Sequence, residues 1–365
     1  MCMYSTRQRP LVAKNDIVCV KYLRKTPGGT LLTPCRDVEP PINKPFKPAN
    51  KEVDFYERFM TVELNGGVIH AQTQNVTGKW GRDCVAFKAI IPKGTEYWVD
   101  VRGYAIAAKK MVITDEKINI NKPDETLLKD ILSQTISSGD ISVGDFYIKD
   151  KGFISPLDMT EEYAKEAVGI VVGFKGKEPL IWDGNVNEYL SIDTHYDSKF
   201  DEFISSEKIK EDMDGEKHMA AFLKKYGKNF DKDSFQVYGK CVTYKPEVGK
   251  WYHPAFGEMN TFIENLMFVH AAAWLTGINA FLPVGWYWTS SEDDANYCWD
   301  VRLGDGNADY YWYYRDDRDR ACFFLASTNN IPKVKINCLT TEKEDKSFIK
   351  KTVKAVKKYV SRRKA

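Results

Sequence analysis

Three segments in the first third of the chain alternate apolar and polar residues, many of them β-branched. They are residues 16–23 (DIVCVKYL), 84–91 (CVAFKAII) and 110–116 (KMVITDE). Because successive side chains of a strand point to opposite faces, this pattern predicts half-buried strands. Sequence rich in Gly and Pro separates them. The pattern therefore predicts a compact β-rich module over residues 1–120.

Residues 121–139 are predicted to form a linker that contains one short helix. Asp124 is suited to cap the helix N-terminus, because its carboxylate can accept a hydrogen bond from a free backbone N–H. Gly139 is suited to end the helix.

Beyond the linker, strand and helix patterns mix, which predicts an α+β domain over residues 140–328. Apolar residues recur at helical spacing over 216–228 and 259–277, and Gly277 closes the second helix. Strands are predicted at 142–154, 166–174, 285–291, 297–303, 308–314 and 321–327. The segment GDGN at 304–307 predicts a hairpin, since Asp-Gly favours tight turns between antiparallel strands.

The tail over residues 329–365 differs in kind. Its final part, EKEDKSFIKKTVKAVKKYVSRRKA, holds ten Lys or Arg residues, and Ile349, Val353, Val356 and Val360 recur at helical spacing. This predicts a basic amphipathic helix. The favoured interpretation is a helix laid on its own protein or on a partner chain, and contact with a membrane surface or nucleic acid is the alternative.

Composition narrows the class of protein. Hydrophobic residues make up 43% and charged residues 28%, and the formal net charge is +2, so general nucleic-acid binding is not expected. Eight cysteines are spread without any C-x-x-C pair, which argues against zinc ribbons and predicts mostly reduced, buried thiols. The start of the chain lacks the apolar run of a secretory signal. We expect a soluble protein made in the cytoplasm, which reaches a virion or cell surface only by another route.

The segment 293–320, DDANYCWDVRLGDGNADYYWYYRDDRDR, carries the clearest chemistry. It holds five tyrosines within eighteen positions, several Asp, Asn and Arg residues, and no Lys or Thr. Tyr gives a large contact area at low entropic cost, and short polar residues adapt their hydrogen bonds. A solvated hairpin would instead favour Lys, Glu and Thr. The composition therefore favours a recognition surface.

Alternation assigns the strand residues to two faces. Trp299, Val301 and Leu303 should face a core, and Cys298, Asp300 and Arg302 should face solvent. On the following strand, one side is predicted to carry Asp309, Tyr311, Tyr313 and Arg315, and the other Tyr310, Trp312 and Tyr314.

Motifs in the second domain resemble those of a bacterial and phage family of C-type-lectin-fold domains. They are KWYHPAFGEMNTFIENLMFVHAAAW, GWYWTSSE, CWDVRLGDGN and DRACFFLAS, in that order. Departures from the family pattern are His253 for Leu, Cys298 for Ala and Cys322 for Arg. The resemblance covers about residues 140–327 and implies a C-type-lectin-like fold there.

Many members of this family resemble the variable proteins of diversity-generating retroelements, which include phage tropism determinants. In those proteins, mutagenesis at template adenines diversifies a surface on a fixed scaffold, and Asp, Tyr and Asn accumulate. The resemblance implies a receptor-binding protein, such as a tail-fibre tip, or a surface-display protein. The implied ligand-binding residues are Asp293, Asp294, Asn296, Tyr297, Asp300, Arg302, Asp305, Asn307, Asp309, Tyr310, Tyr311, Tyr313, Tyr314, Arg315 and Asp316.

The expected partner of this face is a macromolecular receptor, either a protein or a surface glycan. The N-terminal module is similar to a small β domain of phage and prophage proteins from gut bacteria, which implies attachment or assembly. That module or the basic tail is expected to contact a virion or surface-display partner. A homo-oligomer is also expected, and a trimer if the protein is a fibre tip.

Two other functions stay open. A calcium-dependent lectin is one, because Asp305, Asn307 and Asp309 alternate as calcium ligands do, although Tyr310 replaces the Gly and Asp316 the Glu of such a loop. An enzyme of the formylglycine-generating type is the other, with Cys298 and Cys322 as its thiols. We expect that the protein is not an enzyme and that it binds neither a metal nor a cofactor. Trp274, Trp286 and Trp288 are interpreted as core.

Overall fold

The structure is a computed structural model of the 365-residue chain. It describes residues 3–6, 9–34, 37–57, 61–75, 84–183, 188–190, 203–245, 250–282, 285–295, 297–303, 308–314, 321–322 and 325–327. For residues 57, 188–189, 308–314, 321–322 and 325–327, only the backbone is described. The predicted tail over 329–365 lies outside the described residues.

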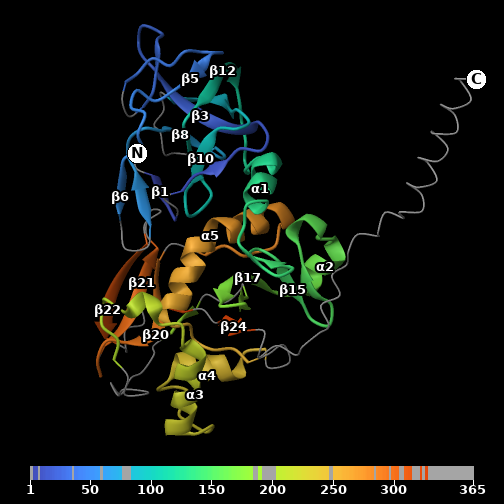
Figure 1. The fold of residues 1–365 in the computed structure, drawn as a ribbon, viewed down its shortest axis with the longest axis vertical. Coiled ribbons are helices and arrows are strands. Elements are labelled where there is room, and N and C mark those ends of the chain that lie inside the picture. The colour runs from blue at the N-terminus through green and yellow to red at the C-terminus, as the bar shows by residue number, and fades with distance from the viewer. Residues whose placement is uncertain are drawn as a thin grey trace, which may run out of the picture.

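The N-terminal part is built from antiparallel strands (Figure 1). A large sheet has the order β2-β10-β11-β8-β3-β9-β12-β5, with β4 paired to β3, and a small sheet has the order β1-β7-β6. The strands are β1 (Met3–Ser5), β2 (Leu11–Val12), β3 (Ile17–Lys25), β4 (Leu31–Leu32), β5 (Pro45–Phe46), β6 (Phe55–Glu57), β7 (Val62–Leu64), β8 (Ile69–Gln72), β9 (Cys84–Ile91), β10 (Glu96–Val99), β11 (Ala105–Ala108) and β12 (Met111–Lys117). The three strands predicted from alternation are confirmed as β3, β9 and β12.

The helix predicted in the linker is α1 (Glu125–Leu132). The Asp124 carboxylate accepts a hydrogen bond from Thr126 N at 2.7 Å, so the predicted cap is confirmed. The predicted end at Gly139 is wrong, because the helix stops at Leu132. Gly139 instead has a φ of +62° in the turn between β13 (Ser137–Ser138) and β14 (Ile141–Ser142), a conformation that favours glycine.

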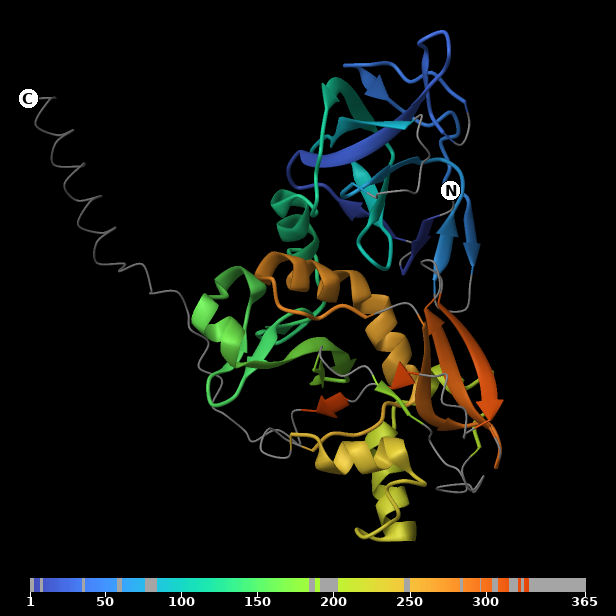
Figure 2. The ribbon, with the colours of Figure 1, turned by 180° about the vertical axis from the view of Figure 1, so that it is seen from behind.

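Helix α1 is a packed element of the fold. It contacts β3 on one side and α5 (Phe256–Thr276) on the other, and Figure 2 shows it between the N-terminal sheet and α5. The buried Asp130 of α1 accepts hydrogen bonds from the Tyr97 hydroxyl at 2.6 Å and from Lys14 N at 2.8 Å. Burial raises the Tyr97 pKa, which keeps that hydroxyl a donor. Apolar packing continues through α1, so one hydrophobic cluster spans both parts of the chain.

Two further sheets flank α5. The first has the order β16-β15-β17-β18-β24 and the second β19-β23-β20-β21-β22. Their strands are β15 (Phe146–Ile148), β16 (Gly152–Ile154), β17 (Ala167–Lys175), β18 (Glu178–Trp182), β19 (Glu188–Tyr189), β20 (Gly285–Glu292), β21 (Tyr297–Leu303), β22 (Ala308–Tyr314), β23 (Ala321–Cys322) and β24 (Leu325–Ser327). The hairpin predicted around GDGN is confirmed, since Leu303 pairs with Ala308.

Helix α5 is the centre of this part. Nearly every side chain from Phe256 to Ala273 is buried, because sheets lie on both sides of the helix. Gly277 follows it with a φ of +71°, as predicted for the residue that ends the helix. The other helical segments are η1 (Pro156–Asp158), α2 (Glu161–Glu166), η2 (Ile209–Glu211), α3 (Gly215–Tyr226) and α4 (Gln236–Thr243).

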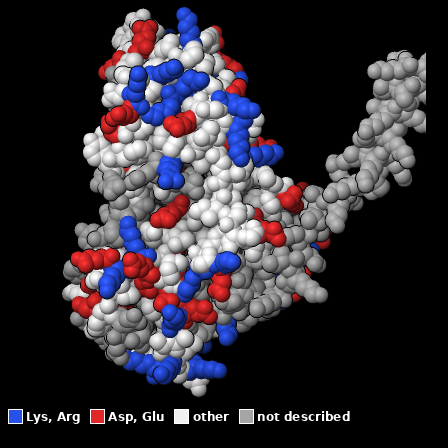
Figure 3. All heavy atoms as spheres, in the orientation of Figure 1, with Lys and Arg blue, Asp and Glu red and all other residues white. Residues whose placement is uncertain are grey.

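The fold is therefore mixed, with separate helices and largely antiparallel sheets, as the sequence predicts for the α+β class. In Figure 3, Lys and Arg side chains gather over the N-terminal sheet, and both signs of charge mix over the C-terminal part. Within the described residues, no helix combines the length and apolar character that crossing a membrane requires.

Candidate functional site

The candidate recognition surface is carried by the strands β20, β21 and β22. Strand β20 pairs with β21 and β21 with β22, both antiparallel. The pairing places Trp286 opposite Arg302 and Trp288 opposite Asp300. Residues of β20, which precede the predicted segment, are thus paired with residues of β21 inside it.

The predicted core side of β21 is confirmed. Trp299, Val301 and Leu303 are each at most 4% exposed. The Trp299 ring meets Phe256 of α5 edge to face at 6.3 Å, and its indole N–H donates to Ile204 O at 2.9 Å. This strand is therefore fixed to the central helix by one large aromatic side chain.

The predicted solvent side of β21 is wrong at two of three positions. Cys298 is 1% exposed and Asp300 is fully buried, while Arg302 is exposed. Strand β20 lies between β21 and β23 in the sheet, and its residues from Tyr287 to Glu292 are all buried. Alternation predicts two different faces only where one face meets solvent. Asp300 is therefore inaccessible to a ligand, and its prediction as a ligand-binding residue is wrong.

At one end of β21, the chain turns from β20 through a short loop. The backbone N–H groups of Asp293 and Asp294 donate to Tyr297 O at 3.1 and 3.4 Å. The Asp294 carboxylate accepts from Tyr297 N at 2.9 Å. All three side chains are partly exposed. Partial burial, and then the negative charge of Asp294, raise the pKa of Asp293.

At the other end of β21, Arg302 lies over Trp286. The guanidinium carbon is 5.2 Å from the centre of the Trp286 ring, within the range of a cation–π contact. Trp286 is partly exposed, so its interpretation as core is wrong, whereas Trp288 is fully buried as predicted. Trp274 is also partly exposed and packs against the edge of the core.

Phe203 is a neighbour of this surface that the sequence did not indicate. It forms a β-bridge with Glu292, next to Asp293, and its side chain is 52% exposed. Ile204 N donates to Glu292 O at 2.9 Å, which holds this segment against the end of β20. An exposed aromatic ring beside the loop enlarges the area available for contact.

The other predicted ligand-binding residues cannot be placed in this way. Asn296, Asp305, Asn307, Arg315 and Asp316 lie outside the described residues. The side chains of Asp309, Tyr310, Tyr311, Tyr313 and Tyr314 also lie outside them, although the backbone of β22 is described.

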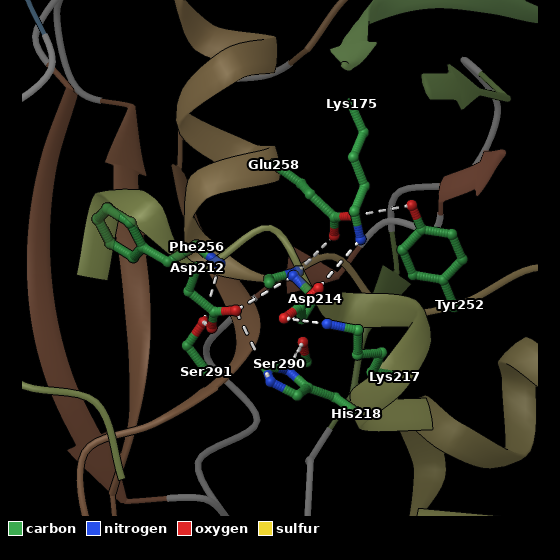
Figure 4. A network of polar contacts seen from close by, with 11 residues as sticks. Lys175, Asp212, Asp214, Lys217, His218, Tyr252, Phe256, Glu258, Ser290 and Ser291 are labelled. Carbon is green, nitrogen blue, oxygen red and sulfur yellow. Dashed lines mark hydrogen bonds and ion pairs between the residues drawn. The ribbon is translucent and has the colours of Figure 1, made fainter. Parts of the chain in front are cut away.

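A buried polar network joins the start of α5 to β20 and α3 (Figure 4). The Ser291 hydroxyl accepts from Phe256 N at 2.9 Å and donates to the Asp212 carboxylate. The Glu258 carboxylate accepts from Ala255 N at 2.9 Å and from the Tyr252 hydroxyl at 3.0 Å. These bonds satisfy N–H groups at the start of α5, which have no partners within the helix itself.

Gly257 belongs to the same arrangement. Its N–H donates to Asp212 O at 2.7 Å. A Cβ at this position would lie 2.5 Å from that oxygen and 2.6 Å from Lys210 O, so no larger residue fits. The motifs YHPAFGEM and TSSE therefore serve to join α5, β20 and the start of α3 into one unit.

The network contains a hydroxyl and an imidazole in contact, which the sequence did not predict because 72 positions separate them. His218 Nδ1 lies 2.8 Å from Ser290 Oγ, and His218 Nε2 lies 3.7 Å from Asp212 Oδ1. A serine, a histidine and an aspartate in this order could activate a nucleophile. All three are at most 8% exposed, and Ser290 is 1% exposed, so a substrate could not reach the hydroxyl. We therefore assign the trio a structural role.

The described cysteines and possible metal ligands are further candidates for sites of chemistry. Cys19, Cys241 and Cys298 are buried, Cys84 is partly exposed, and none of the four forms a disulfide. The Cys322 side chain lies outside the described residues. Where the structure describes side chains, no group of three His, Cys, Asp or Glu residues could hold a metal ion.

Comparisons with known proteins do not identify a family for this chain. No protein-family model and no curated protein matches the chain. The chain is similar to the crystal structure of a fimbrial protein from Bacteroides ovatus ATCC 8483, with 12% sequence identity and a TM-score of 0.34. The similarity covers 86% of this chain and 71% of that one. A TM-score this low establishes neither a shared fold nor a shared function.

Proposed function

We propose that this chain is a ligand-binding display protein whose C-terminal part has a C-type-lectin-like fold. Its recognition residues lie in 293–320: Asp293, Asp294 and Tyr297 are at one end of β21, and Arg302 is at the other end, on the opposite face of the strand. The observation that carries the proposal is a contrast along one strand and its loops. Trp299, Val301 and Leu303 are buried, whereas the partly or fully exposed positions described between 293 and 303 hold Asp, Tyr and Arg, apart from Ala295. These residue types suit recognition of another macromolecule.

The buried network supports a fixed scaffold under this surface. Glu258, Ser290 and Ser291 come from the motifs that resemble the lectin-fold family. Ser291 holds the start of α5 against β20, Ser290 contacts His218 of α3, and Glu258 accepts a hydrogen bond at the start of α5. Changes among the exposed residues leave those bonds untouched. Such a division is what a diversified surface requires, because many sequences must be compatible with one fold.

The partner of the surface is proposed to be a bacterial surface protein or glycan. The N-terminal module or the basic tail is proposed to attach the protein to a virion or another surface. Display in several copies would raise the apparent affinity, since linked sites rebind before the complex separates.

Removing two exposed side chains together, in the variant Tyr297→Ala with Arg302→Ala, should abolish binding while the fold is kept. We expect fluorescently labelled wild-type protein to bind some strains in a panel of intact bacteria, and the variant to bind them at least tenfold less. Thermal unfolding should be nearly unchanged, because neither side chain is buried. The control is Tyr56→Ala with Lys93→Ala, two exposed residues of the N-terminal part, which should bind as the wild type does. Equal binding by both variants would refute the proposed surface.

Calcium should not be needed for folding or binding. Asp293 and Asp294 hold a backbone turn, and their carboxylates do not join a third ligand among the described side chains. Titration with CaCl2 in a calorimeter should give no stoichiometric heat, and strain binding should persist in EDTA. A stoichiometric site together with loss of binding on chelation would instead identify a calcium-dependent lectin.

A further inference from the structure

The N-terminal sheet contains a cavity of about 400 Å³. Its walls come from β3, from the segments after β4 and β5, and from the turn and strand around β8. This volume lies in the range of small-molecule sites. The recognition surface is built from other strands, so the cavity is a separate feature of the fold.

The cavity arises where two strands of the sheet part. The described pairing of β3 with β8 consists of Val20 and Gln72. From there β8 follows β11 down to Ile69, while β3 follows β9 on its other side. The space between β3 and β8 is then bridged by a side chain, because Lys21 Nζ donates to His70 O at 2.5 Å.

The turn before β8 forms another wall of the cavity, and its backbone conformation is fixed by close packing. Gly67 has a φ of +69°, and a Cβ there would lie 1.8 Å from Glu52 O. This close approach fixes the turn that carries Asn65 and Val68, both of which line the cavity. A site whose walls are already in place loses little entropy when a ligand binds.

Lys21 supplies a positive charge and hydrogen-bond donors to the cavity wall. It lines the wall and is 8% exposed, and its Nζ donates to His70 O, which also lines the cavity. An ammonium has three N–H donors, and its attraction for an anion is stronger at a site shielded from water. Residues 1–117 also hold 19 Lys and Arg against 12 Asp and Glu, which favours the approach of an anion.

The rest of the lining is largely apolar. Val68, Ile69 and Ala71 come from the β8 side, and Phe46 and Pro48 from the segment that includes β5. These side chains suit a hydrocarbon body. We propose that the cavity binds a small organic carboxylate, with its carboxylate on Lys21 and its apolar body against these residues.

The probe for this site is octanoate, compared with 1-octanol, which has the same apolar body without the charge. Calorimetry on the full chain should give saturable octanoate binding at one site, at least tenfold tighter than 1-octanol. Lys21→Met keeps the apolar stem but removes the ammonium, so it should weaken octanoate binding at least tenfold and leave 1-octanol unchanged. Lys93→Met removes an exposed cation outside the cavity and should bind octanoate as the wild type does.

A second variant keeps the test decisive if Lys21→Met fails to fold. Val38 lines the cavity and is 44% exposed, so Val38→Trp should narrow the entrance and reduce octanoate binding without touching Lys21. Absence of saturable octanoate binding by the wild type would overturn the proposal. Equal affinity for octanoate and 1-octanol, or undiminished binding by Val38→Trp, would overturn it as well.

Discussion

Replacing Trp299 with alanine is expected to lower the free energy of unfolding by about 3–5 kcal/mol. The side chain is 3% exposed, meets Phe256 of α5 and donates to Ile204 O. Alanine would leave a cavity between β21 and the central helix and would also remove the hydrogen bond to Ile204 O. Urea denaturation followed by circular dichroism measures the change.

Trp286→Ala is the matched control, since it makes the same substitution one strand away. Trp286 is partly exposed and contacts Arg302, so its loss should cost only about 1 kcal/mol. If the two variants lost equal stability, the distinction between a buried scaffold and an exposed surface would fail.

Replacing Glu258 with alanine should be the second large loss, about 1–3 kcal/mol at pH 6. The Ala255 N–H and the Tyr252 hydroxyl would both lose their acceptor inside the protein. Glutamine keeps an oxygen acceptor, so Glu258→Gln should cost much less. Denaturation of both variants beside the wild type measures the difference.

The same residue predicts a dependence on pH. Burial raises the pKa of Glu258 from 4.5 to about 8. Between these values the folded protein keeps a proton that the unfolded chain releases, so this contribution to stability falls as pH rises. Glutamine cannot titrate. The stability of Glu258→Gln relative to wild type should therefore increase between pH 5 and pH 8, and a constant difference would contradict the assignment.

Local pattern was enough to predict much of the fold. Alternation identified β3, β9 and β12, and helical spacing ending at Gly277 identified α5. The turn residues GDGN identified the hairpin of β21 and β22. In each case the property that matters, either the period of the apolar residues or the conformation of a turn, is carried by residues close together in the chain.

The sequence failed where distant segments decide the outcome. Alternation predicts that Asp300 faces solvent, opposite to Trp299. Asp300 is nevertheless buried, because β20 and its neighbours are covered on both faces. The contacts of Ser291 with Phe256 and of His218 with Ser290 join residues at least 35 positions apart. No local pattern reports such contacts. Phe203 was missed for the same reason, since only its bridge to Glu292 brings it beside the surface.

The most direct measurement is the sequence of the DNA that flanks the gene. We expect a near-copy of the region coding for residues 293–320 beside a reverse transcriptase gene, and we expect the two copies to differ at adenines of the template. The differences should fall at exposed positions such as Asp293, Tyr297 and Arg302, and should spare the codons of Trp299 and Val301. Absence of such a repeat, or differences spread equally over the buried positions, would contradict the proposal that this surface is diversified on a fixed scaffold.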